Sequence, residues 1–313
     1  MKAIFVINPI AGGEKKTTFR RKLDFYAQKY KFVYRVYLTI GRHDKRNIKE
    51  LAKEYKPDVI VAVGGDGTLR LVAKVVMHTD MQLGLVPFGS ANGMAAELEV
   101  PINKDQAMEV IFRKGVVLPI DNLRINKKHC CMHIGDVGFN AKLVKHFESE
   151  KKRGLRSYAK HFFKELRFSQ SSKFIIKTDT LKRKTSAHMV AFANARRYGT
   201  GALLNPVGRI NDGYFELCII KDISFKVLLL SILLRFFARS LYHTRFAKII
   251  RCRSATIKLR HKQRLPLQAD GEILGDKHAV HIDIEPQCIN MIVPMDFDPA
   301  LPARATNVVF EGN

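Results

Sequence analysis

Residues 58–77 read DVIVAVGGDGTLRLVAKVVM, and this stretch decides the fold of the first part of the chain. The apolar, β-branched run Val59–Val63 predicts a buried strand, and the segment from Leu69 to Met77 has the spacing of an amphipathic helix. Between them lies Gly64-Gly65-Asp66-Gly67-Thr68. Glycine lets backbone N–H groups come close to a ligand, and at a helix N-terminus such a turn suits an anion, usually phosphate. The stretch therefore predicts a strand, an anion-binding turn and a helix.

This turn is a weak signal when taken alone, because similar turns also occur without a ligand. It is not a Walker A loop, since no GK[ST] follows, and its glycine spacing is not that of a dinucleotide fingerprint. Two more Gly- and Asn-rich loops, NPIAGG at 8–13 and PFGSANG at 87–93, also follow apolar runs. Because the carboxyl ends of parallel strands meet at one edge of a sheet, the three loops together favour a nucleotide cleft.

The alternation of strands and helices extends over residues 1–115. It implies an α/β domain with a mostly parallel sheet and helices on both faces. The predicted strands are Ala3–Ile7, Phe32–Leu38, Asp58–Val63 and Gln82–Pro87, and the predicted helices are 14–30, 44–55, 68–78, 91–98 and 104–113.

After Gly115 the pattern changes to short apolar strands separated by turns, which predicts a β-rich, antiparallel second domain. Two helices are expected to interrupt it, at 154–168 and 223–241. The second is apolar over its first half, so it is either a core helix or an interfacial membrane contact. The predicted strands are Val116–Ile125, Cys130–Val137, Phe174–Thr178, His188–Asn194, Tyr214–Ile220, Thr256–Leu259, Leu265–Ala269 and Val280–Ile284. We predict domains at 1–122 and 123–287, and a C-terminal segment, 288–313, that returns to the first domain.

The charge of the chain is strongly positive, with 54 Lys and Arg against 29 Asp and Glu, a formal net charge of +25. Basic residues are dense at 142–167, 182–184 and 248–264. Such a field attracts polyanions, of which nucleic acid and an anionic membrane are the two obvious kinds. The alternative is that each cluster is merely a solvated face.

Other compositional features indicate a protein of a reducing compartment. The five cysteines form no CxxC pair, and an odd count does not suit a disulfide framework, so we expect the cytosol. The longest apolar stretch, Val227–Phe237, is interrupted by polar residues and falls short of the roughly 20 residues that span a bilayer.

Further motifs appear in a fixed order along nearly the whole chain. They are Asn8-Pro9, Gly64–Thr68, Gly89-Ser90-Ala91-Asn92, Gly135-Asp136-Val137-Gly138-Phe139, Asn211-Asp212-Gly213-Tyr214 and Asp270-Gly271-Glu272. In these motifs the chain resembles the diacylglycerol kinase catalytic-domain family, soluble lipid kinases of bacterial type with sphingosine kinases and, more distantly, NAD kinases as relatives. The resemblance implies an NAD-kinase-like first domain.

The resemblance also implies roles for individual residues. Asp66 would lie near the phosphates of ATP and their Mg²⁺, and Glu272 would be the base that deprotonates the substrate hydroxyl. Without the resemblance, Asp270-Gly271 reads as a hairpin turn. The residues expected to line the ATP site are Asn8, Pro9, Ile10, Ala11, Gly12, Thr39, Gly64, Gly65, Asp66, Gly67, Thr68, Ser90 and Asn92.

A structural Mg²⁺ is also implied, held by Asp212 and by the backbone of Arg209 and Tyr214. One departure concerns Gly93, which stands where many diacylglycerol kinases have Asp. Sphingosine kinases have a small residue there, so Gly93 raises the prospect of a sphingoid base as substrate.

We therefore expect an ATP-dependent lipid kinase that phosphorylates the hydroxyl of diacylglycerol or a similar lipid and gives a phosphatidate-type product. It would be cytoplasmic and peripherally associated with the inner face of an anionic membrane. No nucleic acid partner is expected, and a homodimer is left open. One alternative is a sphingoid long-chain-base kinase. The others are an NAD kinase, disfavoured because no Asn-Glu follows the third loop, and a basic nucleic-acid-binding protein, although no known reading element is present.

Overall fold

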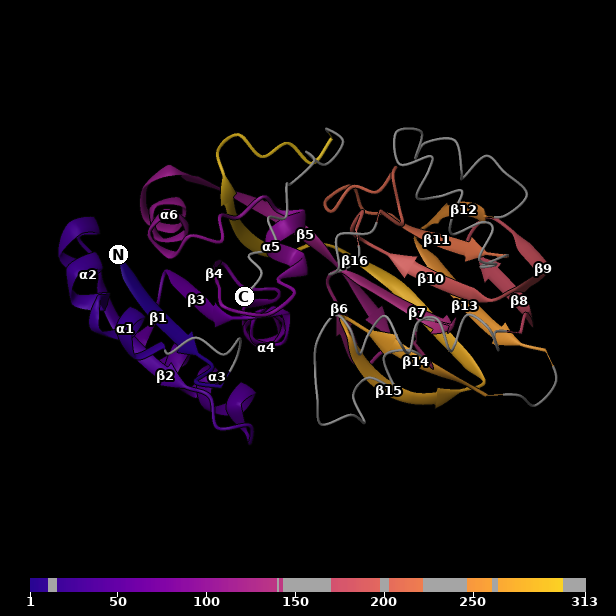
Figure 1. Cartoon of the computed structure of the whole chain (residues 1–313), viewed down its shortest axis with the longest axis horizontal. Coiled ribbons are helices and arrows are strands. Elements are labelled where there is room, and N and C mark those ends of the chain that lie inside the picture. The colour runs from indigo at the N-terminus through magenta and orange to yellow at the C-terminus, as the bar shows by residue number, and fades with distance from the viewer. Residues whose placement is uncertain are drawn as a thin grey trace, which may run out of the picture. The chain divides into compact units, whose positions relative to one another are not determined.

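The structure, a computed structural model, describes residues 1–10, 16–139, 141–142, 170–197, 203–221, 247–260 and 264–300. These residues form two units, whose elements are labelled in Figure 1. The first unit contains the described residues of Met1–Ile120 and those from Cys288 onward, and the second contains the described residues between Asp121 and Gln287. The predicted helices at 154–168 and 223–241 lie outside the described residues.

The first unit is built on a parallel sheet, as predicted. Its strands pair in the order β2-β1-β3-β4, and Asn290 and Met291 of β16 lie beside β4. Every residue of β3 is buried, which is typical of a strand covered on both faces. The strands are β1 (Lys2–Ile7), β2 (Val33–Leu38), β3 (Val59–Gly64), β4 (Gln82–Pro87) and β16 (Ala279–Pro294).

Helices cover this sheet, with α4 against β3 and β4, and α6 against β4. The helix predicted at 14–30 is two helices that meet at Lys22, whose N–H is shared between Phe19 O and Thr18 O. Phe5 lies at the centre of an aromatic core. The helices are α1 (Lys16–Arg21), α2 (Leu23–Tyr30), α3 (Asp44–Tyr55), α4 (Asp66–Val76), α5 (Gly93–Glu97) and α6 (Lys104–Glu109), followed by the π-helical turn η1 (Val110–Lys114).

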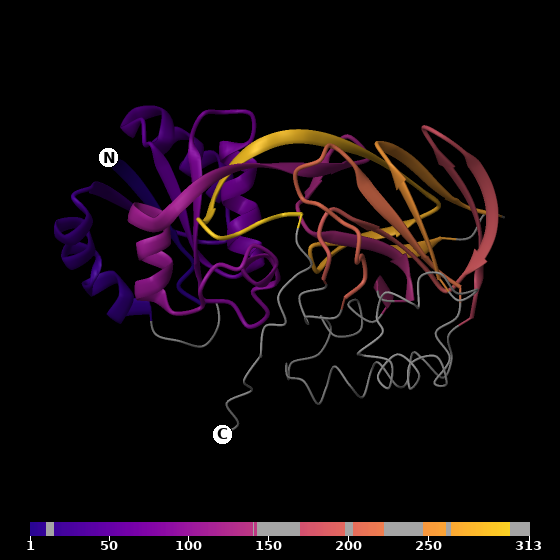
Figure 2. The same ribbon diagram turned by 90° about the horizontal axis from the view of Figure 1, so that it is seen from above.

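The second unit is antiparallel, as predicted, and its strands form two sheets (Figure 2) that share a hydrophobic core. Buried side chains of β8 and β13, such as Phe174 and Ile257, join the same core as Phe192 and Leu217 of the other sheet. One sheet has the order β16-β13-β8-β9, with β13 (Ser254–Leu259), β8 (Ser172–Thr178) and β9 (Lys182–Ala187). The other has the order β12-β11-β10-β7-β14-β15, with β12 (Ala247–Cys252), β11 (Phe215–Ile220), β10 (Met189–Ala193), β7 (Ile134–Gly138), β14 (Leu265–Ala269) and β15 (Glu272–Lys277).

Two strands, β5 (Gly115–Ile125) and β6 (His129–Cys131), form a further antiparallel pair. The strand predicted at 130–137 is therefore two strands, β6 and β7. They separate at Met132 and His133, whose N–H groups donate to the carboxylate of Asp270 instead of a neighbouring strand. The strands β9, β12 and β15 were not predicted, because polar residues or glycine interrupt their apolar pattern.

Candidate functional site

The turn between β3 and α4 has the geometry expected for residues 64–68. Gly65 is the extended N-cap residue of α4, and its carbonyl accepts the N–H groups of Thr68 and Leu69. A Cβ on Gly64 would clash with Oγ1 of the buried Thr68, so a larger residue has no room there. Gly67 is exposed, and a Cβ on it would meet nothing within 4 Å. The turn is thus tight on its inner side and open at Gly67.

The loop after β4 packs directly on this turn. A Cβ built on Gly89 would lie 2.5 Å from Cα of Gly65, so the two backbones meet with no side chain between them. The N–H of Phe88 also donates to Gly64 O over 2.9 Å. The loops at the carboxyl ends of β3 and β4 therefore form one backbone surface.

Asp66 holds this pair of loops together. Its carboxylate accepts the N–H of Gly93 at Oδ2 and the N–H of Met94 at Oδ1, each over 3.0 Å. These donors are the first residues of α5, where an anion is stabilised by unpaired N–H groups. Asn92 precedes them in the left-handed conformation, and its side chain donates to Gly89 O and accepts the N–H of Gly89. Asp66 therefore acts on the shape of both loops.

The remaining predicted residues of the first unit follow β1, β2 and β4. The N–H of Asn8 donates to Val63 O, and the N–H of Thr39 donates to Ile7 O, so both follow the carboxyl ends of neighbouring strands. The side chain of Asn8 accepts the N–H of Ile10, whose side chain is 88% exposed. Pro9 and Ser90 are exposed. Ala11 and Gly12 lie outside the described residues.

In the second unit, Asp270-Gly271 is a two-residue hairpin turn between β14 and β15. Both residues have positive φ, at 48° and 79°, as in a type I′ turn. The carboxylate of Asp270 accepts the N–H groups of Met132 and His133 and the thiol of Cys131. Burial, reinforced by Asp270, raises the pKa of the Cys131 thiol, which therefore stays protonated as a donor.

Glu272 is the first residue of β15 and is exposed. The turn beside it is fastened to a second sequence motif by Gln268. The side chain of Gln268 accepts the N–H of Gly271 over 3.0 Å and donates to Oδ2 of Asp136 over 2.5 Å. Asp136 is fully buried, and its other oxygen accepts the N–H of Ala141. The backbone next to Glu272 is therefore anchored in the interior of the second unit.

The loop Asn211–Tyr214 is also built around carboxylates. Oδ1 of Asp212 accepts the N–H of Tyr214 over 3.0 Å, and Oδ2 accepts from Arg251 over 2.6 Å. The Arg251 guanidinium lies 3.9 Å from the centre of the Tyr214 ring and 3.8 Å from Oε1 of Glu216. Arg251 therefore supplies positive charge at the position where the sequence predicts Mg²⁺. A cation on Asp212 would have to share or displace these partners.

Two buried acids support this loop and were missed by the sequence analysis. Asp121 accepts the N–H groups of Gly213 and Gln287, each over 2.7 Å, and burial raises its pKa. Glu216 accepts from Asn205 over 2.6 Å, and burial raises its pKa to about 7. Asp121 and Glu216 each lie within an apolar run. The only sign of them in the sequence is a carboxylate inside a predicted strand.

Comparison with known proteins identifies the family. Residues 2–125 match the diacylglycerol kinase catalytic domain, and residues 136–293, half of the chain, match the YegS C-terminal NAD kinase beta sandwich-like domain. The chain belongs to the diacylglycerol kinase family, in its YegS-like branch. As a member of this kinase family the chain is an enzyme.

Named relatives are distant in sequence. Lipid kinase YegS of Escherichia coli K12 is 25% identical over 267 residues, which cover 83% of this chain and 86% of that protein. The YegS protein of Escherichia fergusonii matches with the same identity and coverage. This YegS-like chain also shares the fold of two solved structures from Bacillus anthracis strain Sterne. One has a TM-score of 0.76 at 20% identity and covers 94% of this chain and 97% of that one. The other, described as a diacylglycerol kinase, has a TM-score of 0.72 at 18% identity and covers 95% and 98%.

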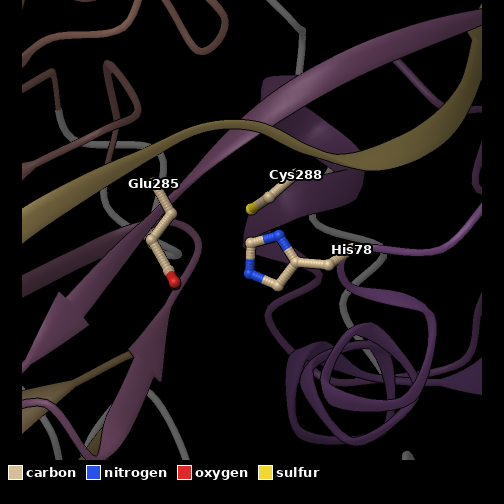
Figure 3. Close-up of side chains that lie close together, drawn as sticks. All are labelled: His78, Glu285 and Cys288. Atoms are coloured by element: carbon tan, nitrogen blue, oxygen red, sulfur yellow. The ribbon is translucent and has the colours of Figure 1, made fainter.

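Two possible ligand atoms lie together elsewhere in this YegS-like chain. Figure 3 shows the His78 ring beside the Cys288 sulfur, and the N–H of His78 donates to Cys288 O over 2.8 Å. Glu285, the third labelled residue, belongs to the second unit, where Asn122 and Arg124 donate to its carboxylate. His78 and Cys288 supply only two ligands within one unit, fewer than a metal centre requires. None of the described helices is long and apolar enough to cross a membrane.

Proposed function

We propose that this protein transfers the γ-phosphoryl group of ATP to the hydroxyl of a lipid, diacylglycerol or a similar molecule, and gives a phosphatidate-type product. One observation carries the proposal. The loops after β3 and β4 form a single backbone surface, fastened by Asp66, at a sheet edge that lies within the match to the diacylglycerol kinase catalytic domain.

The backbone of this surface supports binding of the ATP phosphates. Gly65 and Gly67 bring N–H groups to the N-terminus of α4, where the helix dipole favours negative charge. No side chain separates Gly65 from Gly89, so a phosphate can approach the peptide groups closely. Mg²⁺ bound to the nucleotide would supply neutralisation of the charge on the transferring group. Asp66 is proposed as a positioning residue, because its carboxylate accepts the N–H groups of Gly93 and Met94 and so links the two loops.

Glu272 is proposed as the general base. The O–H bond of the lipid breaks as its proton passes to the Glu272 carboxylate, and the hydroxyl oxygen forms a bond to the γ-phosphorus. The bond between that phosphorus and the bridging oxygen breaks, and ADP leaves with the electron pair. Exposure of Glu272 at the start of β15 supports this role, since a base must reach its substrate. The anchored turn at Asp270-Gly271 limits the backbone freedom of Glu272.

A second Mg²⁺ is predicted at Asp212. We propose that this ion would compete with Arg251 for the Asp212 carboxylate. The donor set there contains one half-buried carboxylate, and each of its two oxygens already accepts a hydrogen bond. No catalytic step depends on this cation. Its binding would instead affect the stability of the loop Asn211–Tyr214.

The proposed substrate is a lipid. The proposed location is the inner face of the cytoplasmic membrane, because its anionic surface attracts a strongly basic chain. A sphingoid base is the second candidate. Gly93 favours it, because a glycine at this position removes the carboxylate that many diacylglycerol kinases carry.

The test is phosphoryl transfer from γ-labelled ATP with Mg²⁺ to diacylglycerol, sphinganine and NAD in detergent micelles. We expect labelled lipid with diacylglycerol, and its loss in Glu272→Gln. Asp276→Asn, also exposed on β15, is the matched control and should keep wild-type turnover. Label on NAD, or on no acceptor, would overturn the proposal, and label on sphinganine alone would select the second candidate.

A further inference from the structure

We propose that the outward face of β13, β8 and β9 in the second unit docks on an anionic lipid bilayer. We call it the lysine face, and it consists of Lys173, Lys177, Lys182, Lys184, Lys258 and Arg260. The inference rests on the proposed lipid kinase function, because that function brings the protein to a membrane. The evidence for the docking surface itself is the charge of one face of a sheet.

The alternation of burial defines this face. In β8 the side chains of Phe174 and Ile176 are buried in the core, so Lys173, Ile175 and Lys177 point the other way. The same alternation in β13 buries Ile257 and Leu259, and it leaves Lys258 exposed.

The strand register brings the lysines side by side. Lys258 pairs with Ile175, which pairs with Lys184 on β9, so one row across the sheet reads Lys-Ile-Lys. In the next row Lys177 pairs with Lys182. Paired residues of adjacent strands share a face and lie about 5 Å apart. The lysines of the three strands are therefore one cluster, which the sequence distributes over residues 173–258.

Negative charge does not balance this cluster. Among the described residues, none of the five lysines forms an ion pair with a carboxylate, and β13, β8 and β9 contain no acidic residue. The nearest acids are Asp179, in the turn after β8, and Asp283 on β16. Asp179 accepts the N–H of Arg253, and Asp283 accepts from Ser254 and pairs with His281. Lys177 and Lys182 oppose each other directly, an arrangement that costs folding free energy. An anionic partner would remove this repulsion.

Protection of a sheet edge accounts for only part of the pattern. β9 is the last strand of its sheet (Figure 1), and lysines on an edge strand discourage pairing with another chain. That explanation covers Lys182 and Lys184. It does not cover Lys177 and Lys258, which lie on the inner strands β8 and β13.

A lipid surface fits this face better than a nucleic acid does. Proteins that bind single strands add aromatic side chains on which bases stack, and the outward positions of β13, β8 and β9 carry none. Its charges are almost all lysine ammonium groups, which suit a disordered layer of headgroups more than bidentate recognition of one phosphate. Ile175 at the centre adds an apolar side chain that can reach the headgroup boundary.

The test is sedimentation of the nucleotide-free full chain with phosphatidylcholine vesicles, with and without phosphatidylglycerol. The variant Lys177→Glu/Lys184→Glu is compared with Lys45→Glu/Lys53→Glu, which has the same change in charge on exposed positions of α3. Since each lysine near an anionic leaflet contributes measurably to binding, we expect the first variant to lose about tenfold or more of the partition coefficient. The second should stay within about twofold of the wild type. Folding should be kept, because the carboxylate introduced at position 177 would face Lys182 as an opposite charge.

Equal binding by the two variants would overturn the proposal, as would absence of wild-type binding at low salt. A single-stranded oligonucleotide bound by the wild type in place of vesicles, and lost in Lys177→Glu/Lys184→Glu, would make nucleic acid the partner and also overturn it. The micelle assay separates the two proposals. Phosphorylated lipid without vesicle binding leaves the kinase function standing, and vesicle binding without any phosphorylated acceptor leaves only the lysine face standing.

Discussion

The side-chain amide of Gln268 donates to the carboxylate of Asp136 over 2.5 Å, and both residues are buried. Through its oxygen, Gln268 also accepts the N–H of Gly271, next to Glu272. One amide thus connects two motifs that are more than 130 residues apart in the chain. The position of the proposed base depends on a residue that is part of neither motif.

Replacing Gln268 with Met keeps the volume but removes both hydrogen bonds. A buried carboxylate oxygen of Asp136 then loses a donor, which we expect to cost about 2 kcal/mol of unfolding free energy. Turnover should fall while the affinity for ATP stays the same, because the side-chain hydrogen bonds of Gln268 to Asp136 and Gly271 lie within the second unit. Denaturant unfolding and ATP titration calorimetry would check this. Unchanged stability would show that the network is not needed.

Asp66→Ala should lower both activity and stability. The loss of two N–H bonds to a carboxylate, from Gly93 and Met94, releases α5 from the turn before α4 and should cost about 2–4 kcal/mol. Phosphoryl transfer should fall by about 10²- to 10³-fold, as expected when a preorganised phosphate site is disturbed. Thermal unfolding and initial rates on folded protein would measure the two effects. A variant with wild-type turnover would contradict the role of Asp66.

Glu272→Gln should act on chemistry alone. The side chain is exposed, so we expect unfolding to be unchanged, and turnover should fall by about 10²- to 10⁴-fold as basicity is lost. Single-turnover rates and calorimetric ATP affinity are the measurements. If the lost basicity affects only a late proton transfer in a loose transition state, the decrease will be at the lower end of this range. Full turnover would exclude Glu272 as the base.

Arg251→Met tests the predicted Mg²⁺ at Asp212. Loss of the guanidinium removes the partner of Oδ2, so the melting temperature should drop. Mg²⁺ should recover part of this drop in the variant and have a smaller effect on the wild type, because a ligand that binds only the folded state stabilises it. Differential scanning calorimetry with Mg²⁺ or EDTA distinguishes the cases. No response to Mg²⁺ in either protein would mean that the loop is not a metal site.

Asp44 should make stability depend on acid pH. Burial opposes its ionisation, but hydrogen bonds from the N–H of Ile40, the hydroxyl of Tyr37 and the N–H of Gly41 outweigh burial and lower its pKa. Its pKa is thus lower in the folded than in the unfolded chain. The stabilisation is present above the ordinary value of 3.8 and is lost as pH falls through the folded pKa. Urea midpoints at pH 5.5 and below should fall more steeply for the wild type than for Asp44→Asn. Parallel curves would contradict this.

The sequence predicted the first unit well, because β1, β3 and β4 are short apolar runs followed by loops that contain glycine or proline. β4 was predicted at its observed bounds, Gln82–Pro87, and α3 matches 44–55. The break at Lys22 was not predicted, since it comes from a local turn within a continuous apolar face. The loops at 8–10, 64–68 and 88–93 follow neighbouring parallel strands, as their positions in the sequence indicated.

The second unit was harder to predict. β9 reads KRKTSA, which has almost no apolar residue, because one of its faces is solvated and it forms the edge of a sheet. The buried polar residues that hold the site loops in place were not predicted either, for a different reason. Gln268 and Asp121 act through partners more than 100 residues away, and spacing in the sequence does not show which distant groups a buried polar side chain will meet.

The close approach of Gly65 and Gly89 has a consequence for mutational tolerance. Even alanine at Gly89 would place its methyl group 2.5 Å from a backbone carbon, and no rotamer can relieve a clash with Cβ. In a saturation scan of these loops, Gly89 should therefore reject all nineteen alternatives, while Gly67, two residues from Gly65, should accept small side chains. The sequence alone does not distinguish Gly67 from Gly89, because both are glycines in glycine-rich loops. A library that aims to change the nucleotide or lipid preference should therefore keep residue 89 fixed and vary residue 67.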